Sequence, residues 1–195
     1  MRAEQRRRSR QAGFTLLEVL LAAVLLVLVT AFAGIGLAVG QRVMADGMRI
    51  AQAKENVLRA LAHMVPEIRE SGTTTSGSGI AVEDGGRRLR FRKNIGFDGN
   101  QVIWSEEIVY EYHAEDGNGV AAGTITRTGP ESSAAGAAIA TTTVAVEIDP
   151  SFGFELNAAG DEVTITIGSS TTLSDGTAAT FPQGGPLVER VRLRN

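Results

Sequence analysis

Gly13-Phe14-Thr15-Leu16-Leu17-Glu18 begins the longest apolar run of the chain, and this run decides how the protein is organised. From Val19 to Gly40 there are 22 consecutive positions without a charged side chain. At 1.5 Å per residue a helix of that length would be about 33 Å long, enough to cross a bilayer core of roughly 30 Å. The sequence therefore predicts one membrane-spanning helix near the amino terminus.

Composition limits what the rest of the chain can be. The 195 residues include no cysteine, which excludes a disulfide framework, thiolate metal sites and cysteine nucleophiles. About 150 residues lie beyond the apolar segment, enough for one modest globular domain. After Gly13 the chain carries 14 basic and 21 acidic residues, a net charge of −7. Because nucleic-acid binding depends on a basic surface, no nucleic-acid partner is expected.

The residues up to Gly13 form a basic leader. Arg6-Arg7-Arg8-Ser9-Arg10 precedes the apolar run, and the positive-inside rule keeps such a cluster in the cytoplasm. The bulk of the chain would then emerge outside the membrane. A secretory signal could be cut near Ala31-Phe32-Ala33, before Gly34, and an uncut signal anchor is a second alternative.

Glu18 is the unusual residue of the apolar segment. A carboxylate at the centre of a spanning helix costs roughly 2.5–3.5 kcal/mol, so it either lies at the water-exposed edge or has a partner. Gly13 to Leu20, after the arginine-rich leader, resembles the cleavage and methylation signature of type IV prepilins and pseudopilins. This resemblance favours a third fate for the leader, cleavage between Gly13 and Phe14.

The resemblance implies a processing route and a set of partners. A prepilin peptidase would remove the leader on the cytoplasmic side of the inner membrane and methylate the new amino group of Phe14. Glu18 would pair with the terminal amine of a neighbouring subunit, because two groups that are each costly in lipid become tolerable when they neutralise one another. The implied partners are that peptidase, other pilin or pseudopilin subunits, the inner-membrane assembly platform and the lipid bilayer.

Beyond the membrane segment, apolar residues recur at helical spacing. The stripe comprises Val43, Ile50, Val57, Leu61, Met64 and Ile68. It predicts an amphipathic helix that continues the membrane helix to about Ser71-Gly72, with Pro66 kinking it or loosening its last turn. We expect a leader at 1–13, a membrane half of the helix at 14–40, an amphipathic half at 41–71 and a β-rich domain at 72–195.

Short alternating segments follow a linker at Thr73 to Gly79 and predict six or seven strands. The segments are Leu89 and Phe91, Ile108 to His113, Gly123 to Arg127, Val144 to Ile148, Val163 to Ile167 and Val188 to Leu193. Ser132 to Thr143 and Ser169 to Pro186 are expected to be long loops. The pattern predicts an α+β fold, resembling a type IV pilin, in which a small antiparallel sheet lies on the amphipathic helix.

Two shorter matches bear on the kind of subunit. The closing segment, Val188 to Asn195, resembles the final strand of the larger minor pilins and J-class minor pseudopilins. Ile108 to Tyr112, followed by Thr124 to Arg127, resembles a strand pair in the same groups. These matches favour a minor subunit over a major one.

The sequence offers little material for catalysis or metal binding. Its two histidines are far apart, and the simplest interpretation of His63 is a residue on the helix surface. Asp98-Gly99-Asn100 and Asp116-Gly117-Asn118 are ordinary turn sequences without the spaced acids of a calcium loop. Glu106-Glu107 would point to opposite faces of a strand. No catalytic, metal-binding or cofactor-binding residue is expected, and the chain is not expected to be an enzyme.

Arg88, Arg90 and Arg92 alternate with Leu89 and Phe91, which predicts a strand with one basic and one apolar face. The simpler interpretation of the basic face is solvation. Contact with an acidic partner subunit is the alternative.

These features predict a minor pilin or pseudopilin, an assembly subunit of a type IV pilus or of a type II secretion pseudopilus. The alternative is an exported binding or sensing domain held by an uncut signal anchor. A membrane-tethered enzyme is a third and less favoured interpretation.

Overall fold

A computed structural model describes residues 14–72, 79–114, 123–132 and 137–194 of the chain. The chain divides into two compact units, residues 1–44 and 45–195. Helix α1 (Leu16–Glu70) begins in the first unit and ends in the second. The helix continues through Pro66, so this proline does not end it. Its last residue is Glu70, directly before Ser71, which agrees with the end predicted from the sequence.

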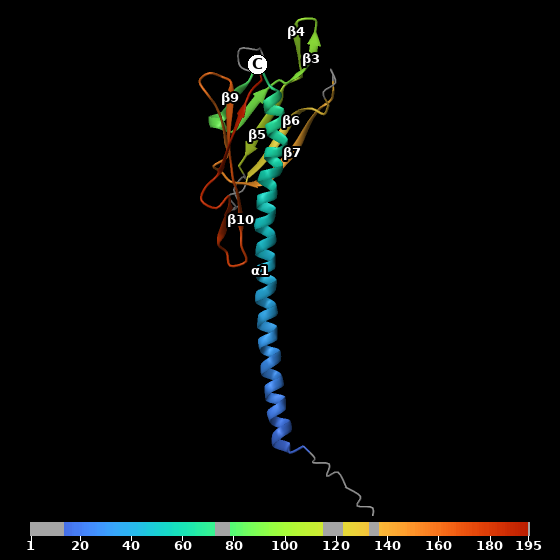
Figure 1. The fold of residues 1–195 in the computed structure, drawn as a ribbon, viewed down its shortest axis with the longest axis vertical. Coiled ribbons are helices and arrows are strands. Elements are labelled where there is room, and N and C mark those ends of the chain that lie inside the picture. The colour runs from blue at the N-terminus through green and yellow to red at the C-terminus, as the bar shows by residue number, and fades with distance from the viewer. Residues whose placement is uncertain (1–13, 73–78, 115–122, 133–136, 195) are drawn as a thin grey trace, which may run out of the picture. The chain divides into compact units, whose positions relative to one another are not determined.

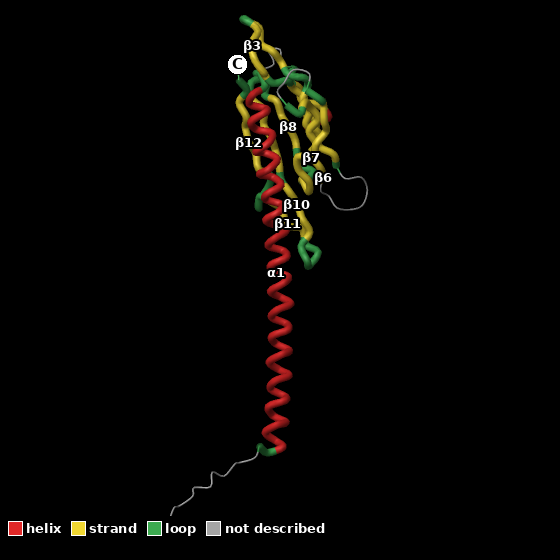
Figure 2. Tube along the Cα trace, turned by 90° about the vertical axis from the view of Figure 1, so that its right-hand side faces the viewer, coloured by secondary structure: helices red, strands yellow, loops and turns green. Residues whose placement is uncertain are grey.

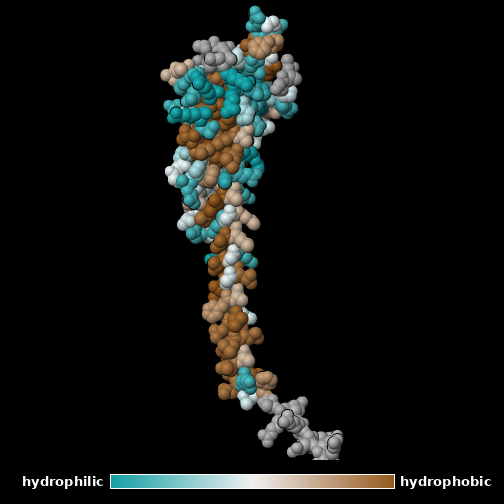
Figure 3. Space-filling view, in the orientation of Figure 1, coloured by the Kyte–Doolittle hydropathy of each residue, from teal (hydrophilic) through white to brown (hydrophobic). Residues whose placement is uncertain are grey.

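The described part of the first unit is dominated by the apolar beginning of α1. All of its large apolar side chains are exposed, from Phe14 through Phe32 to Met44. Hydrophobic colour covers most of this part of the helix in Figure 3. Among the described residues, α1 is the one helix long and apolar enough to cross a membrane. Such an exposed apolar helix surface is suited to a lipid environment.

The second unit carries twelve strands among its described residues, all paired antiparallel (Figure 1). The largest sheet has the order β1 (Ala81–Glu83), β2 (Arg88–Phe91), β5 (Ile108–His113), β6 (Gly123–Pro130), β7 (Ile139–Ile148), β10 (Ser169–Thr172) and β11 (Ala178–Phe181). A three-stranded sheet has the order β12 (Leu187–Arg192), β9 (Glu162–Ile167) and β8 (Gly153–Leu156), and β3 (Asn94–Asp98) pairs with β4 (Gln101–Trp104) as a hairpin.

The core lies between the carboxy-terminal part of α1 and the inner faces of the two larger sheets. The helix contributes its buried stripe, with Val57, Met64 and Ile68 fully buried. Strand residues at alternate positions complete the core, among them Leu89, Phe91, Ile108, Ile125, Val163, Ile165 and Val191. The predicted α+β arrangement, a long amino-terminal helix packed on an antiparallel sheet, is confirmed.

A glycine brings the two larger sheets together. Gly86 closes the short 3₁₀ turn η2 (Asp84–Gly86) between β1 and β2. Its φ is +95°, and a Cβ atom there would lie 2.8 Å from the carbonyl oxygen of Phe154 on β8. Any other residue would therefore push β8 away from the turn.

The end of α1 joins the two sheets at another point. Ser71 forms an antiparallel bridge with Lys93, just after β2, and Gly72 forms a parallel bridge with Arg194, just after β12. The residues that follow the helix therefore connect the ends of both strands. In Figure 2, β12 runs alongside the carboxy-terminal part of α1.

The strand predictions are confirmed in part. Every predicted strand is present, and β5 pairs with β6 as expected. Two loop predictions are wrong, because β7 already begins at Ile139, and Ser169 to Pro186 contains the β10–β11 hairpin. The short strands β1, β3, β4 and β8 were not predicted. Residues 73–78 of the predicted Thr73 to Gly79 linker and the turn at Asp116-Gly117-Asn118 lie outside the described residues.

Candidate functional site

The amino-terminal end of α1 holds the predicted assembly residues. Gly13 lies outside the described residues, whereas Phe14 is described and 80% exposed. Thr15 precedes the first helical residue, and its Oγ1 accepts a hydrogen bond from the backbone N–H of Glu18 at 3.3 Å. Thr15 is therefore the N-cap of α1, and Thr15-x-x-Glu18 has the spacing of a capping box.

This geometry gives Glu18 two separable properties. Its position in the first helical turn places the carboxylate near the positive end of the helix dipole. Its side chain is exposed, and the carboxylate forms no hydrogen bond or ion pair with any residue that the structure describes. A carboxylate that is positioned by its helix but has no partner in its own chain can form an ion pair with a cationic group of another chain.

A second carboxylate of α1, Glu67, lies in a polar cluster between the helix and the main sheet. Arg127 on β6 binds it with two hydrogen bonds, from Nε to Oε2 and from Nη2 to Oε1, both 2.9 Å. The hydroxyl of Tyr110 on β5 donates to Oε2 at 2.7 Å, and the Lys93 ammonium lies 3.9 Å from Oε1. The side chains of Arg127 and Glu67 are only 9% and 16% exposed.

His63 joins this cluster from the helix surface. Its Nδ1 lies 2.9 Å from the Tyr110 hydroxyl oxygen. Because the hydroxyl proton is directed at Glu67, the imidazole is the donor in this contact, and its Nδ1 carries a proton. The prediction that His63 is a helix-surface residue is consistent with its exposure, but the residue also has a specific partner.

The cluster shifts the pKa values of its members in opposite directions. Burial alone would raise the pKa of the Glu67 carboxyl, but hydrogen bonds from Arg127 and Tyr110 and the charges of Arg127 and Lys93 hold it below its ordinary value. Burial, followed by the charge of Glu67, raises the pKa of the Tyr110 hydroxyl far above its ordinary value. Glu67 thus stays ionised and Tyr110 stays neutral across the physiological range.

The basic face of β2 is partly used within the domain. Arg90 Nε lies 2.8 Å from Glu83 and its Nη1 lies 3.6 Å from Glu107, while Arg88 Nε lies 3.9 Å from Glu83. Leu89 and Phe91 on the other face are fully buried, as predicted. Arg92 is exposed and follows the end of β2 rather than belonging to the strand. The three arginines are therefore not equivalent.

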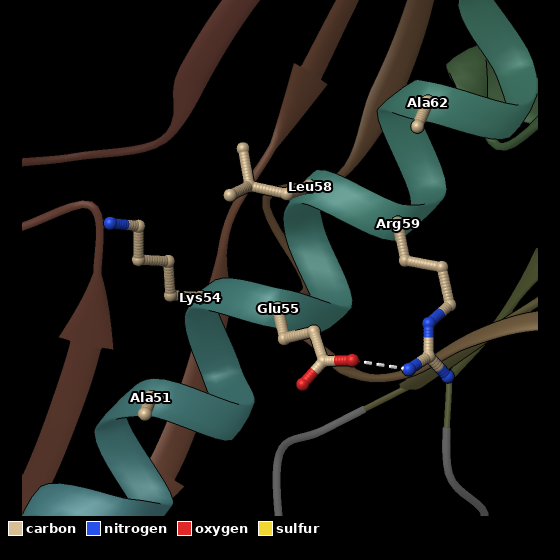
Figure 4. Close-up of a pocket in the computed structure, with 6 residues that line it drawn as sticks. All are labelled: Ala51, Lys54, Glu55, Leu58, Arg59 and Ala62. Atoms are coloured by element: carbon tan, nitrogen blue, oxygen red, sulfur yellow. Dashed lines mark hydrogen bonds and ion pairs between the residues drawn. The ribbon is translucent and has the colours of Figure 1, made fainter.

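The side of α1 that faces away from the core has a shallow, open hollow (Figure 4). Ala51, Leu58 and Ala62 form its apolar part, and Lys54, Glu55 and Arg59 complete its lining. Glu55 and Arg59 pair with each other one helical turn apart, as the sequence spacing favours. The hollow contains no catalytic arrangement of side chains, but its small residues allow a close approach by another helix.

The described residues contain no group of three or more histidine, cysteine, aspartate or glutamate side chains that could hold a metal ion. Asp98, Gly99 and Asn100 form the turn of the β3–β4 hairpin, with Gly99 at a φ of +60°. Glu106 and Glu107 precede β5 rather than lying within a strand, and Glu107 pairs with Arg90.

Residues 8–34 match the prokaryotic N-terminal methylation motif. No curated protein and no solved structure matches the chain significantly. The motif, the long apolar helix and the α+β domain together support a type IV pilin-like protein, and α1 is long and apolar enough to cross a membrane. More narrowly, the chain carries the type IV prepilin signature, which implies processing by a prepilin peptidase and assembly with other pilins.

Proposed function

We propose that this chain is a minor subunit of a type IV pilus or of a type II secretion pseudopilus. The observation that carries the proposal is the methylation motif at residues 8–34, which is continuous with a helix that packs on a β-rich domain. In this proposal the protein acts mechanically. Its apolar helix packs among the helices of neighbouring subunits, and its sheet domain presents the specific contacts.

Processing comes first in this scheme. The leader stays in the cytoplasm at the inner membrane, the peptidase cuts between Gly13 and Phe14, and the new amino group of Phe14 is methylated. The basic leader supports this orientation through the positive-inside rule. The exposed Phe14 side chain and the helix start at Leu16 support access to the cut.

Glu18 then selects the position of the subunit in the assembly. The terminal amine of a neighbouring subunit and the Glu18 carboxylate are each costly in lipid, and they neutralise one another when they meet. The absence of a partner for this carboxylate within the described chain supports the role, as does the exposed apolar surface around it. An apolar contact alone would not fix the register, whereas an ion pair does.

Glu18 variants test this role in the full chain, expressed in a cell that assembles it. Glu18→Gln keeps a side chain of the same shape and the capping-box pattern but removes the charge, so processing should continue while recovery in the assembled fraction falls at least tenfold (about 1.4 kcal/mol). Thr15→Ala is the matched control, since it removes the cap and keeps the charge; assembly should persist.

An assembled fraction that is unchanged by Glu18→Gln would overturn the ion-pair role. Absence of an assembled fraction in the wild type as well, with the leader still present on the protein, would instead favour the alternative of an exported binding domain on an uncut anchor.

A further inference from the structure

The outer face of β12 carries a row of three arginines. Arg190 and Arg192 in the strand, and Arg194 just after it, alternate with the buried Val191 and Leu193. Alternate residues of a strand share a face and lie about 6.8 Å apart. All three arginines are exposed. We call them the β12 arginine row.

The β12 arginine row has no partner within the part of the chain that the structure describes: none of its guanidinium groups forms a hydrogen bond or an ion pair there. The contrast with β2 is direct, because Arg90 lies 2.8 Å from Glu83. The arginines of β2 are thus paired with carboxylates of the same domain, whereas the β12 arginine row is not.

The position of β12 leaves the row accessible. The strand pairs with β9 on one side and is the edge of its sheet (Figure 2). Its other side is bridged only at Arg194, by Gly72, among the described residues. An edge strand with exposed charges can meet another protein without any rearrangement of the sheet.

The neighbouring charges indicate the chemistry of the partner. Arg192 lies opposite Glu162 on β9, and Arg190 lies opposite Thr164, which in turn lies opposite Glu155 on β8. This face of the three-stranded sheet therefore carries the β12 arginine row at its edge and carboxylates on the neighbouring strands β9 and β8. A uniform polyanion such as DNA would gain from the arginines but be repelled by these carboxylates. A protein surface with its own carboxylates spaced to meet the row avoids that repulsion.

We propose that the β12 arginine row docks on a carboxylate-bearing surface of a neighbouring pilin-like subunit. The inference rests on the proposed function and adds the contact surface to it. The charge of the chain after Gly13, 14 basic against 21 acidic residues, supports this partner, because subunits of similar composition carry a surplus of carboxylates. The contact is set by opposite charges at the edge of β12, and it excludes subunits that lack them.

Site-directed photo-crosslinking in the full chain tests the proposal. Val188 precedes Arg190 by two residues on the same face and is 53% exposed, so p-benzoylphenylalanine in its place samples whatever lies against the row. In cells that assemble the protein, we expect one covalent adduct with a second protein that itself carries a methylation motif. The adduct should map to a peptide containing aspartate or glutamate.

Charge variants make the result specific. Arg190→Glu with Arg192→Glu should reduce the adduct roughly tenfold or more, whereas Arg190→Lys with Arg192→Lys should retain it. Arg69→Glu with Arg92→Glu is the control, since both residues are exposed, lie outside β12 and give the same change in net charge. This control pair should leave the adduct unchanged.

Four results would overturn the inference: no adduct, an adduct with nucleic acid, an adduct that survives reversal of the β12 arginines, or its loss in the control pair alone. The last result would assign the contact to Arg69 or Arg92 instead. Intact mass of the same samples separates this failure from that of the proposed function. A chain that is processed at Phe14 and assembled, but forms no adduct, refutes the docking surface alone.

Discussion

Two carboxylates of the same helix have opposite surroundings. Glu67, near the end of α1, receives hydrogen bonds from Arg127 and Tyr110 and is largely buried. Glu18, in the first turn, is exposed, and its carboxylate has no partner among the described residues. A carboxylate that finds its cation within the chain stabilises the fold. A carboxylate without such a partner is free to form an ion pair with a cation of another chain. In lipid it needs that ion pair, because an isolated charge there is costly.

The largest expected effect comes from removing the satisfied carboxylate. Glu67→Ala leaves Arg127 and Lys93 charged at mostly buried positions, so the free energy of unfolding should fall by about 3–5 kcal/mol. Urea denaturation of the detergent-solubilised full chain measures it. Glu70→Ala, an exposed change in the same helical turn, is the control and should cost less than about 1 kcal/mol. Equal losses in the two variants would refute the stabilising role of the cluster.

Acid should weaken the same cluster reversibly. The pKa of Glu67 is lower in the folded chain than its reference value of 4.5, so its contribution to stability is fully present above pH 4.5. It is lost as the pH falls through the folded-state pKa, because the unfolded chain then binds the proton first. Unfolding free energies measured between pH 6 and pH 3 should therefore decline more steeply for the wild type than for Glu67→Gln. Parallel curves would contradict this assignment.

Removing one hydroxyl should have a smaller effect. Tyr110→Phe deletes the donor to Glu67 and the acceptor of His63 while keeping the buried ring, at a cost of about 2 kcal/mol. Tyr112→Phe is the matched control, since that hydroxyl makes only a 3.4 Å contact with the carbonyl of Ile148. Thermal unfolding monitored by circular dichroism distinguishes them. A larger loss of stability in Tyr112→Phe than in Tyr110→Phe would contradict the assignment of the stabilising hydroxyl to Tyr110.

The unpartnered carboxylate should matter least for the fold of the single chain. Glu18→Gln removes only a favourable charge near the helix terminus, worth about 0.5 kcal/mol or less at an exposed site. The same urea titration should show almost no change, although assembly fails. A loss comparable to that of Glu67→Ala would mean that Glu18 has a structural role after all, and the contrast between the two residues would disappear.

The sequence predicts the parts of this fold in which burial is periodic. The apolar stripe that includes Val57, Met64 and Ile68 gives α1, and the alternation around Leu89 and Phe91 gives β2. Apart from Phe181, β10 and β11 consist of serine, threonine and alanine, so no alternation of large apolar residues marks them. Those strands depend on backbone pairing, which has no signature in side-chain hydropathy.

The polar cluster was missed for a different reason. Arg127 follows Ile125 by two residues, so the alternation of β6 places a charge on the buried face, and this signal was available in the sequence. The partner of that charge lies 60 residues away on a helix, and no local pattern connects the two. Glu18, by contrast, was singled out because its signature is local: the basic leader, the cleavage motif and the carboxylate in the apolar segment all lie within a few residues of Gly13.

The most direct test of the account is the intact mass and amino-terminal sequence of the protein recovered from membranes. We predict a chain that begins at Phe14 and carries one additional methyl group. A chain that begins at Gly34 would contradict the account, because it would be a released domain without its helix anchor. A chain that still contains Arg6 to Arg10 would contradict it as well, since it would be a plain signal anchor in which Glu18 has no neighbouring amine to meet.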